Sequence, residues 1–383
     1  MNPFKYGTIV TGKDFADRKD ELKLLIQELT SGQNMILYSP RRYGKSSLMI
    51  NVLEALKNNG ILTAYIDMYG CVFLSDLVDD LVEKTVLPAY GTLEKTSKFL
   101  RSAFSGIRPE FTVNSDGSFK VSLKKEVASQ GEKAVLDKIL DAPEQLAKAK
   151  GKPLVVVFDE FQEIVNLDGD VLENLMRSHF QHHEHVSYVF MGSKRHILEE
   201  IFEDANRPFY RFAKPFPLGK IPIKEFKQFI TTKFEETNIH IDSATIDLML
   251  KFTDGHPYFT QQLCHELWNL AYENKTVKEV DVTKAIQELL RIHKDLFVKQ
   301  WDTLTIHQKK LLVGLSWEER VTKIYASSFI EKYELISSSH VYRAMEPLLK
   351  DGTVEKIDDT YSLTDVFFKE WVKSKTRGTT SVD

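Results

Sequence analysis

The stretch ILYSPRRYGKSSLM at residues 36–49 nearly matches the phosphate-binding pattern G-x-x-x-x-G-K-[ST], but Ser39 stands at the first glycine position. Such a loop requires a buried strand before it and a helix after it. The apolar run NMILY at 34–38 predicts the strand, and KSSLMINVLEALKNNG at 45–60 carries apolar residues at helical spacing before Gly60. These surroundings favour a nucleotide site over a chance occurrence of Gly-Lys-Ser.

Each residue type in this loop has an expected role. Gly44 lets the backbone approach the phosphates, whose oxygens backbone N–H groups and the positive helix end would hold. Lys45 would reach the β- and γ-phosphates of ATP, and the Ser46 hydroxyl would be a Mg²⁺ ligand. Ser39 replaces a residue used for a tight turn, and Pro40 can fix the turn that follows. The expected nucleotide-binding residues here are Ser39, Pro40, Arg41, Arg42, Tyr43, Gly44, Lys45, Ser46 and Ser47.

A second motif lies in KPLVVVFDEFQEI at 152–164, an apolar run that ends in two acidic residues. Parallel strands buried on both faces have such sequences, and open α/β sheets bind ligands at the carboxyl ends of their strands. We expect Asp159 to hold Mg²⁺ through its water shell and Glu160 to orient and activate the attacking water. An acidic pair at the start of a helix is the alternative, and the preceding phosphate loop argues against it.

Two further strands complete the predicted sheet. LTAYIDMYG at 62–70 follows the helix of the phosphate loop, and VSYVFMGSKR at 186–195 follows the acidic strand after one intervening helix. Alternation of strands and helices on this scale predicts an α/β fold with a parallel, doubly wound sheet.

Six segments occur in an order that is more specific than any one of them. Together they resemble the archaeal/bacterial ATPase family within the STAND division of AAA+-like P-loop NTPases, over roughly residues 1–290. They are FADRKDELKLL (15–25), YSPRRYGKSSLM (38–49), VVVFDEFQEI (155–164), VFMGSKRHILEEIF (189–202), NRPFYRFA (206–213) and TDGHPYFTQQLC (253–264).

The resemblance implies further site residues. Arg18 and Glu21 would help form the adenine pocket, and Ser193 would be the polar sensor at the end of a strand. His256 and Pro257 match the G-x-P signature of a helical lid, where the proline packs near adenine and ribose. The arginines best placed to sense a γ-phosphate are Arg195, Arg207 and Arg211. Pairing with carboxylates is an equal alternative for each of the three.

The rest of the chain predicts additional parts. We expect a P-loop core at 1–219 with an insertion at about 88–140, a helical lid at 220–295, a winged helix at 300–375 and a disordered tail at 376–383. The insertion contains a hairpin pattern around Asp116-Gly117. In the winged-helix region, 11 Lys and Arg face 12 Asp and Glu between Trp301 and Lys375, so charge does not indicate DNA as a partner.

Composition and charge bear on where the protein is located and on whether it holds a structural metal. The net charge is −4, and the two cysteines show no metal-binding spacing, so we expect a protein of the cytoplasm. No apolar run approaches the roughly 18 residues needed to cross a membrane. The histidines of HFQHHEH at 179–185 are more typical of a polar connection than of a metal site.

The function expected from these patterns is that of an ATP- and Mg²⁺-binding STAND-type ATPase. It would be a nucleotide-gated switch with slow hydrolysis that acts on an unknown protein partner. The alternative is a nucleotide-dependent regulator that binds DNA or protein and has negligible turnover.

Overall fold

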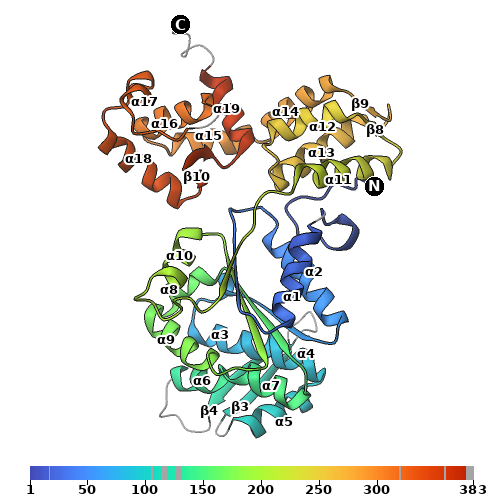
Figure 1. The fold of residues 1–383 in the computed structure, drawn as a ribbon, viewed down its shortest axis with the longest axis vertical. Helices are drawn as coiled ribbons and strands as arrows, with labels where there is room; N and C mark the ends of the chain where they lie inside the picture. The colour runs from blue at the N-terminus through green and yellow to red at the C-terminus, as the bar shows by residue number, and fades with distance from the viewer. Residues whose placement is uncertain are drawn as a thin grey trace. The chain divides into compact units, whose positions relative to one another are not determined.

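The computed structural model forms two compact units, Ile9–Gly219 and Met1–Thr8 together with Lys220–Asp383 (Figure 1). The chain crosses between them at Thr8–Ile9 and at Gly219–Lys220. The residues that the structure describes are 1–16, 18–104, 107–113, 119–125, 132–318, 321–357 and 359–376.

A parallel sheet of five strands lies at the centre of the Ile9–Gly219 unit. Its strand order is β2-β5-β6-β1-β7, and all its pairings are parallel. Every residue of β1, β5 and β6 is buried, which explains why these strands are continuous apolar runs in the sequence. The predicted α/β class with a parallel P-loop-type sheet is therefore confirmed. The strands are β1 (Met35–Tyr38), β2 (Leu62–Asp67), β5 (Leu154–Asp159), β6 (Val186–Gly192) and β7 (Lys214–Pro217).

Helices cover both faces of this sheet. Side chains alternate between the faces along a strand, so Val155 and Val157 pack with α1 and α2, whereas Val156 and Phe158 belong to the opposite cluster. Figure 1 shows α1 and α2 on one side of the sheet and α8, α9 and α10 on the other. The helices of the unit are η1 (Gly12–Asp14), α1 (Lys19–Thr30), α2 (Lys45–Asn58), η2 (Met68–Gly70), α3 (Leu74–Leu81), η3 (Val82–Val86), α4 (Leu87–Tyr90), α5 (Leu93–Ala103), α6 (Glu132–Ile139), α7 (Ala142–Lys150), η4 (Phe161–Glu163), α8 (Ile164–Leu167), α9 (Gly169–Phe180) and α10 (Arg195–Glu203).

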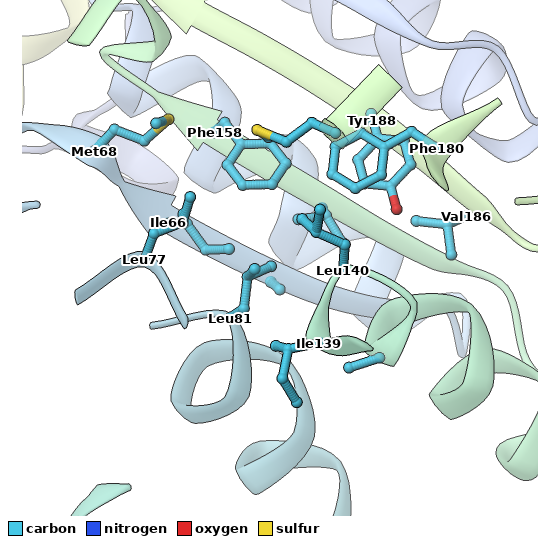
Figure 2. Packing of buried hydrophobic residues seen from close by; sticks show 14 of the residues in the cluster. Ile66, Met68, Leu77, Leu81, Ile139, Leu140, Phe158, Phe180, Val186 and Tyr188 are labelled. Atoms are coloured by element: carbon cyan, nitrogen blue, oxygen red, sulfur yellow. The ribbon is translucent and has the colours of Figure 1, made fainter. Parts of the chain in front are cut away.

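An aromatic group fills the larger of the two clusters. Figure 2 shows Phe158 of β5 beside Phe180 and Tyr188, with Leu77 and Leu81 of α3 on the same face of the sheet. The rings of Phe180 and Tyr188 are stacked with their centroids 4.0 Å apart. Such pairs stabilise by about 0.5–1.5 kcal/mol beyond the area that they bury.

The expected insertion contains an antiparallel pair of strands, β3 (Ile107–Val113) and β4 (Phe119–Lys125). Their register runs from the Ile107–Lys125 pair to the Val113–Phe119 pair, as in a hairpin. The predicted turn at Asp116-Gly117 lies outside the described residues.

The second unit contains a group of helices followed by a winged helix. A short pair of parallel strands, β8 with β9, joins two of the connections between these helices. The elements before the winged helix are α11 (Ile223–Glu235), β8 (His240–Ile241), α12 (Ser243–Phe252), α13 (Pro257–Ala271), β9 (Thr276–Val277), α14 (Glu279–Ile292) and α15 (Lys294–Asp302).

The first eight residues belong to this second unit, although the sequence suggested that they were part of the P-loop core. Phe4 is 1% exposed, and its ring lies 4.7 Å from that of Phe234 in α11. His265 of α13 hydrogen-bonds the Phe4 carbonyl oxygen through Nδ1 at 2.8 Å. This placement depends on a contact across some 230 residues of sequence, from Phe4 to Phe234, which local patterns do not reveal.

The predicted winged helix is present. Its two-stranded wing pairs antiparallel from Val354–Leu363 to Ile357–Thr360. Aromatic residues of α19 attach it to the preceding helices, since Phe367 packs on Phe252 and Phe259. Asp358 of the expected wing turn and the tail from 377 lie outside the described residues. The elements are α16 (Ile306–Trp317), α17 (Ser327–Lys332), α18 (Ser338–Lys350), β10 (Val354–Ile357), β11 (Thr360–Leu363) and α19 (Val366–Thr376).

Two observations concern membranes and cysteines. In the described ranges, no helix is both long and apolar enough to span a bilayer. Cys71 and Cys264 are free thiols, and both are buried.

Candidate nucleotide-binding site

The phosphate-binding loop connects the carboxyl end of β1 to the first residue of α2. Gly44 has a φ of 87°, and a Cβ built on it would have no atom within 4 Å. Arg42 also adopts the left-handed conformation, with a φ of 65°. Gly44 is the N-cap of α2 and has no side chain that could occupy the start of the helix. The loop thus leaves open space next to the positive end of a helix, which is the arrangement that binds phosphate.

Lys45 is folded back over this loop. Its Nζ donates to the carbonyl oxygens of Ser39 at 3.0 Å and Pro40 at 3.3 Å. The side chain is 6% exposed, and burial lowers the pKa of Lys45, while the nearby Glu160 and Asp159 act in the opposite direction. Its Nζ also lies 3.4 Å from the Ser39 hydroxyl, so the buried ammonium is held by neutral oxygens alone and is well suited to a phosphate anion.

The two halves of the expected metal site are in contact. The Ser46 hydroxyl donates to Asp159 Oδ2 at 3.0 Å, and the Tyr65 hydroxyl donates to the same oxygen. Burial is the largest effect on Asp159 and raises its pKa. Burial, followed by the Asp159 charge, raises the pKa of Tyr65. Hard oxygen donors at this separation are the ligand type that Mg²⁺ prefers, so Ser46 and Asp159 fit such an ion.

Glu160 follows β5 in a left-handed conformation, with a φ of 50°. Its Oε2 accepts hydrogen bonds from the Ser193 hydroxyl at 2.9 Å and from the Gln162 amide. Gln162 is 2% exposed, and among the described residues its Oε1 has no hydrogen-bond partner. A Cβ at Gly192 would lie 2.0 Å from that oxygen, so any other residue there would force the Gln162 amide to move. Three residues from two neighbouring strand ends, Gln162, Gly192 and Ser193, therefore determine the surroundings of this carboxylate.

The other loop residues show mainly structural contacts. Tyr43 is buried, whereas Arg41 and Arg42 are exposed. The Ser47 hydroxyl accepts the backbone N–H of Val10 at 3.1 Å. Arg41, Arg42 and Tyr43 lie in the loop and Ser47 in the first turn of α2, and their contact with a nucleotide stays a prediction.

Arg18 has a different position from that of an open pocket residue. Its guanidinium is buried and bonds Glu21 at 3.0 Å, the Tyr43 carbonyl at 3.1 Å and the Gly219 carbonyl at 2.9 Å. Arg18 therefore fastens the start of α1 to the phosphate loop and to the last residue of its unit. The predicted role in an adenine pocket is not tested by these contacts.

The three candidate arginines have distinct surroundings. Arg207 forms an ion pair with Glu173, which is completely buried, and its Nη1 lies 3.2 Å from Asp170. Arg195 bonds Glu199, and its guanidinium carbon lies 5.0 Å from the centre of the Tyr38 ring at the end of β1. Of Arg207 and Arg195, Arg195 is the one that lies beside the phosphate loop. The guanidinium of the third, Arg211, lies over the ring of the neighbouring Tyr210.

The lid signature lies in the other unit. His256 precedes α13 and Pro257 is its first residue, where proline suits a helix. Gly255 before them has a φ of 63°. Thr253 at the end of α12 and Thr260 in α13 share a hydroxyl hydrogen bond of 2.7 Å, which joins the two sides of this connection. The role of His256 and Pro257 toward adenine stays a prediction.

Two residues of the site are absent from the sequence-based prediction, Tyr65 and Gln162. Tyr65 lies in β2, and its hydroxyl reaches Asp159 because β2 and β5 are neighbours in register. Gln162 lies two residues after Glu160, so its proximity to the acidic pair was the available signal. Neither position has a side chain that a local pattern distinguishes.

The histidines at 179–185 contact carboxylates. His179 lies 2.8 Å from Asp141, and His185 lies 2.8 Å from Glu144. Over the part of the chain that the structure describes, no group of three or more His, Cys, Asp or Glu side chains is arranged to hold a metal ion. These contacts attach the connection between α9 and β6 to the segment around α7.

Comparison with known proteins agrees with this geometry. A family model described as an ATPase domain predominantly from Archaea matches residues 15–263, and one for a probable winged helix domain matches residues 295–374. No curated protein sequence matches the chain.

Solved structures share the fold at low sequence identity. A Walker-type ATPase of Pyrococcus abyssi is 19% identical with a TM-score of 0.66, covering 97% of this chain and 99% of that one. The ORC2 protein of Aeropyrum pernix in ADPNP–ADP complexes is 15% identical with a TM-score of 0.58, covering 98% of both chains. Its ADP form is 14% identical with a TM-score of 0.51, covering 99% and 98%.

Proposed function

This chain belongs to the family of ATPase domains found predominantly in Archaea, and from that premise we propose that it is an ATP- and Mg²⁺-binding switch of the STAND type that hydrolyses ATP slowly. The observation that supports it best is the 3.0 Å contact between Ser46 and Asp159, which joins the phosphate loop to the acidic motif. The ORC2 protein that shares the fold is described with ADPNP and ADP, which supports an adenine nucleotide as the ligand.

Residues of the loop would bind and orient the phosphates. The N–H groups before α2 would hold the phosphate oxygens, and Lys45 would exchange its carbonyl partners for the β- and γ-phosphates. Ser46 and Asp159 would hold Mg²⁺, which supplies charge neutralisation on the phosphates when bound. Ser193 would fix the direction of the Glu160 carboxylate through the bond between them.

The proton of the attacking water would pass to Glu160. In the structure, Oε2 of Glu160 already accepts bonds from Ser193 and Gln162. A carboxylate oxygen that is occupied by donors has fewer lone pairs free to accept the proton of the water. This arrangement supports slow hydrolysis, as expected of a switch that holds ADP between signals.

The other parts of the chain would carry the response. We assign residues 220–295 to a lid that responds to the nucleotide through His256 and Pro257, and residues 300–375 to a winged helix that reports the state to a partner. A cytoplasmic location is supported by the free thiols of Cys71 and Cys264.

The test combines nucleotide content with turnover. The purified chain is denatured and its released nucleotide is measured, and we expect stoichiometric ADP. Glu160→Gln should retain ATP binding and lower kcat by on the order of 100-fold, whereas Lys45→Ala should lose binding. The matched control is Glu54→Gln, an exposed residue of α2. Full turnover in Glu160→Gln would refute the assigned base.

A regulator with negligible turnover is the second candidate. It is favoured by the winged helix, whose family model matches residues 295–374. Its third helix, α18, exposes Tyr342 and Arg343, although acidic and basic residues are balanced in this region. A gel shift at low salt with and without ATP separates the candidates: salt-sensitive DNA binding without hydrolysis supports the regulator, and absence of binding removes its DNA-binding form.

A further inference from the structure

Three apolar side chains point into solvent in the segment between β2 and α3. Tyr69 is 77% exposed, Val72 70% and Phe73 65%. Apart from Met1, they are the most exposed large hydrophobic side chains among the described residues. We name Tyr69, Val72 and Phe73 the apolar loop. Single exposed apolar residues are ordinary, but a contiguous group marks a site of interaction.

Hydrogen bonds hold the backbone of the apolar loop in place. Asp67 Oδ1 accepts the N–H of Tyr69 at 3.0 Å. Asp76 Oδ2 accepts the N–H groups of Val72 at 2.9 Å and Phe73 at 2.8 Å. All three exposed residues therefore have their backbone fixed by a carboxylate. A surface ordered before binding loses less conformational entropy when a partner arrives.

Buried residues alternate with the exposed ones. Met68 and Leu77 are 0% exposed, and Figure 2 shows both within the cluster that contains Phe158. Cys71, between Tyr69 and Val72, is also buried. The segment is thus anchored on the core at its centre and at both ends, and its exposed side chains are not a frayed end of the chain.

The sequence on both sides of the apolar loop carries only acidic charges. Between Asn58 and Glu83 the sequence contains four acidic residues, Asp67, Asp76, Asp79 and Asp80, and no Lys or Arg. Burial, followed by the charges of Asp80, Asp76 and Asp67, raises the pKa of the Cys71 thiol to about 12. This negative potential repels the phosphates of nucleic acid and attracts a cationic partner.

We propose that the apolar loop is a docking surface for a basic, amphipathic segment of a partner protein. Exposed aromatic side chains on a rigid backbone are the residue type that dominates binding energy at protein interfaces. The apolar face of the segment would cover Tyr69, Val72 and Phe73. Its Lys and Arg side chains would lie toward Asp67 and Asp76, whose carboxylates hold the backbone of the apolar loop and whose charge complements them.

The position of the apolar loop couples it to the acidic motif. Asp67 at the end of β2 is the register partner of Asp159 at the end of β5. The next turn, η2, lies against η4, which directly follows Glu160. A partner on the apolar loop would therefore contact η2, which packs against the turn beside the proposed base. This coupling to turnover rests on the proposed function, whereas the docking itself does not.

The test selects peptides that bind to the whole chain of residues 1–383. A displayed library of random peptides is enriched for binding in the absence of ATP, and selected peptides are titrated against the Tyr69→Ser/Phe73→Ser variant. The matched control is Val171→Ser, because Val171 is a 51% exposed apolar residue of the same unit. We expect peptides rich in Lys, Arg and large apolar residues. Their Kd should rise roughly tenfold in the double variant, not in the control, and rise with salt.

Other outcomes overturn the proposal. A basic docking segment at this surface is excluded if the selected peptides are acidic or uncharged. It is also excluded if the peptides bind the wild-type chain and the double variant with equal affinity, or if selection on the wild-type chain enriches no more peptides than selection on the double variant. A change of oligomeric state in the double variant, seen by light scattering, would instead identify a second copy of the chain as the occupant. Thermal unfolding checks that the double variant is folded. Because binding is measured without ATP, failure of the proposed ATPase leaves this result readable.

Discussion

Replacing Glu355 with glutamine should stabilise the second unit at neutral and alkaline pH. Glu355 lies in β10 of the wing, and among the described residues its Oε2 is buried without a hydrogen-bond partner. Burial raises the pKa of Glu355 to about 7; the Lys220 charge opposes this shift, and the Asp254 charge adds to it. Gln keeps the shape of the side chain and removes the charge.

The magnitude follows from the difference in pKa between the folded and unfolded chain. A shift from 4.5 to about 7 corresponds to about 3 kcal/mol. The folded state retains the proton between these values and the unfolded state does not, so stability falls as the pH rises through this window. Since the side chain is partly accessible to solvent, we expect a gain of about 2 kcal/mol for Glu355→Gln at pH ~8, and little difference below pH ~4.5.

The assay uses the tryptophans of the chain. All four belong to the Lys220–Asp383 unit, at positions 268, 301, 317 and 371, so their fluorescence follows this unit alone. Urea unfolding is measured at several pH values for wild type, Glu355→Gln and the control Glu346→Gln, an exposed residue of α18. If wild type and Glu355→Gln lose stability in parallel as the pH rises, Glu355 is not the buried acid and the reasoning is refuted.

Three further substitutions test contacts around the acidic motif. Tyr65→Phe removes the hydroxyl that donates to Asp159, and Mg²⁺ affinity, titrated in the presence of ATP, should fall about tenfold; unchanged affinity would exclude this support. Gln162→Met removes a donor that occupies Oε2 of Glu160, so kcat should rise about tenfold at constant KM for ATP, and an unaltered or lower kcat would contradict the restraint that these bonds place on the base. Gly192→Ala forces a Cβ to 2.0 Å from Gln162 Oε1 and should cost about 1–3 kcal/mol in urea unfolding; equal midpoints would contradict this packing.

Features that depend on local sequence could be predicted. The strand expected at 34–38 is β1 (Met35–Tyr38), and the run that ends at Asp159 is β5. Both are buried on two faces, so nearly every residue is apolar and the pattern is dense. The helix expected from Lys45 likewise begins at that residue. Because the carboxyl ends of parallel strands share one edge, adjacency of Ser46 and Asp159 was also within reach of the sequence.

Features that depend on register or distant packing could not be predicted. Tyr65 reaches Asp159 only because β2 and β5 are neighbours, and nothing in LTAYIDMYG specifies its neighbour. The buried guanidinium of Arg18 depends on the carbonyls of Tyr43 and Gly219, which are far apart in sequence. For the apolar loop, the local sequence pattern predicts the wrong environment. Its residues are of the type that is usually buried, so a hydrophobicity pattern alone places them in the core.

The serine at the first position of the phosphate loop has a physical explanation. Glycine is required where the backbone adopts a positive φ, and in this loop the left-handed residues are Arg42 and Gly44, whereas Ser39 is not among them. Ser39 is buried, its hydroxyl donates to the Pro40 carbonyl at 3.0 Å, and its own carbonyl accepts Lys45. A small polar side chain therefore fits a turn whose geometry does not depend on the absence of a Cβ. Among the fixed positions of the G-x-x-x-x-G-K-[ST] pattern, the substitution lies at the one where the backbone tolerates a Cβ. Gly44, Lys45 and Ser46 are the residues that phosphate binding requires.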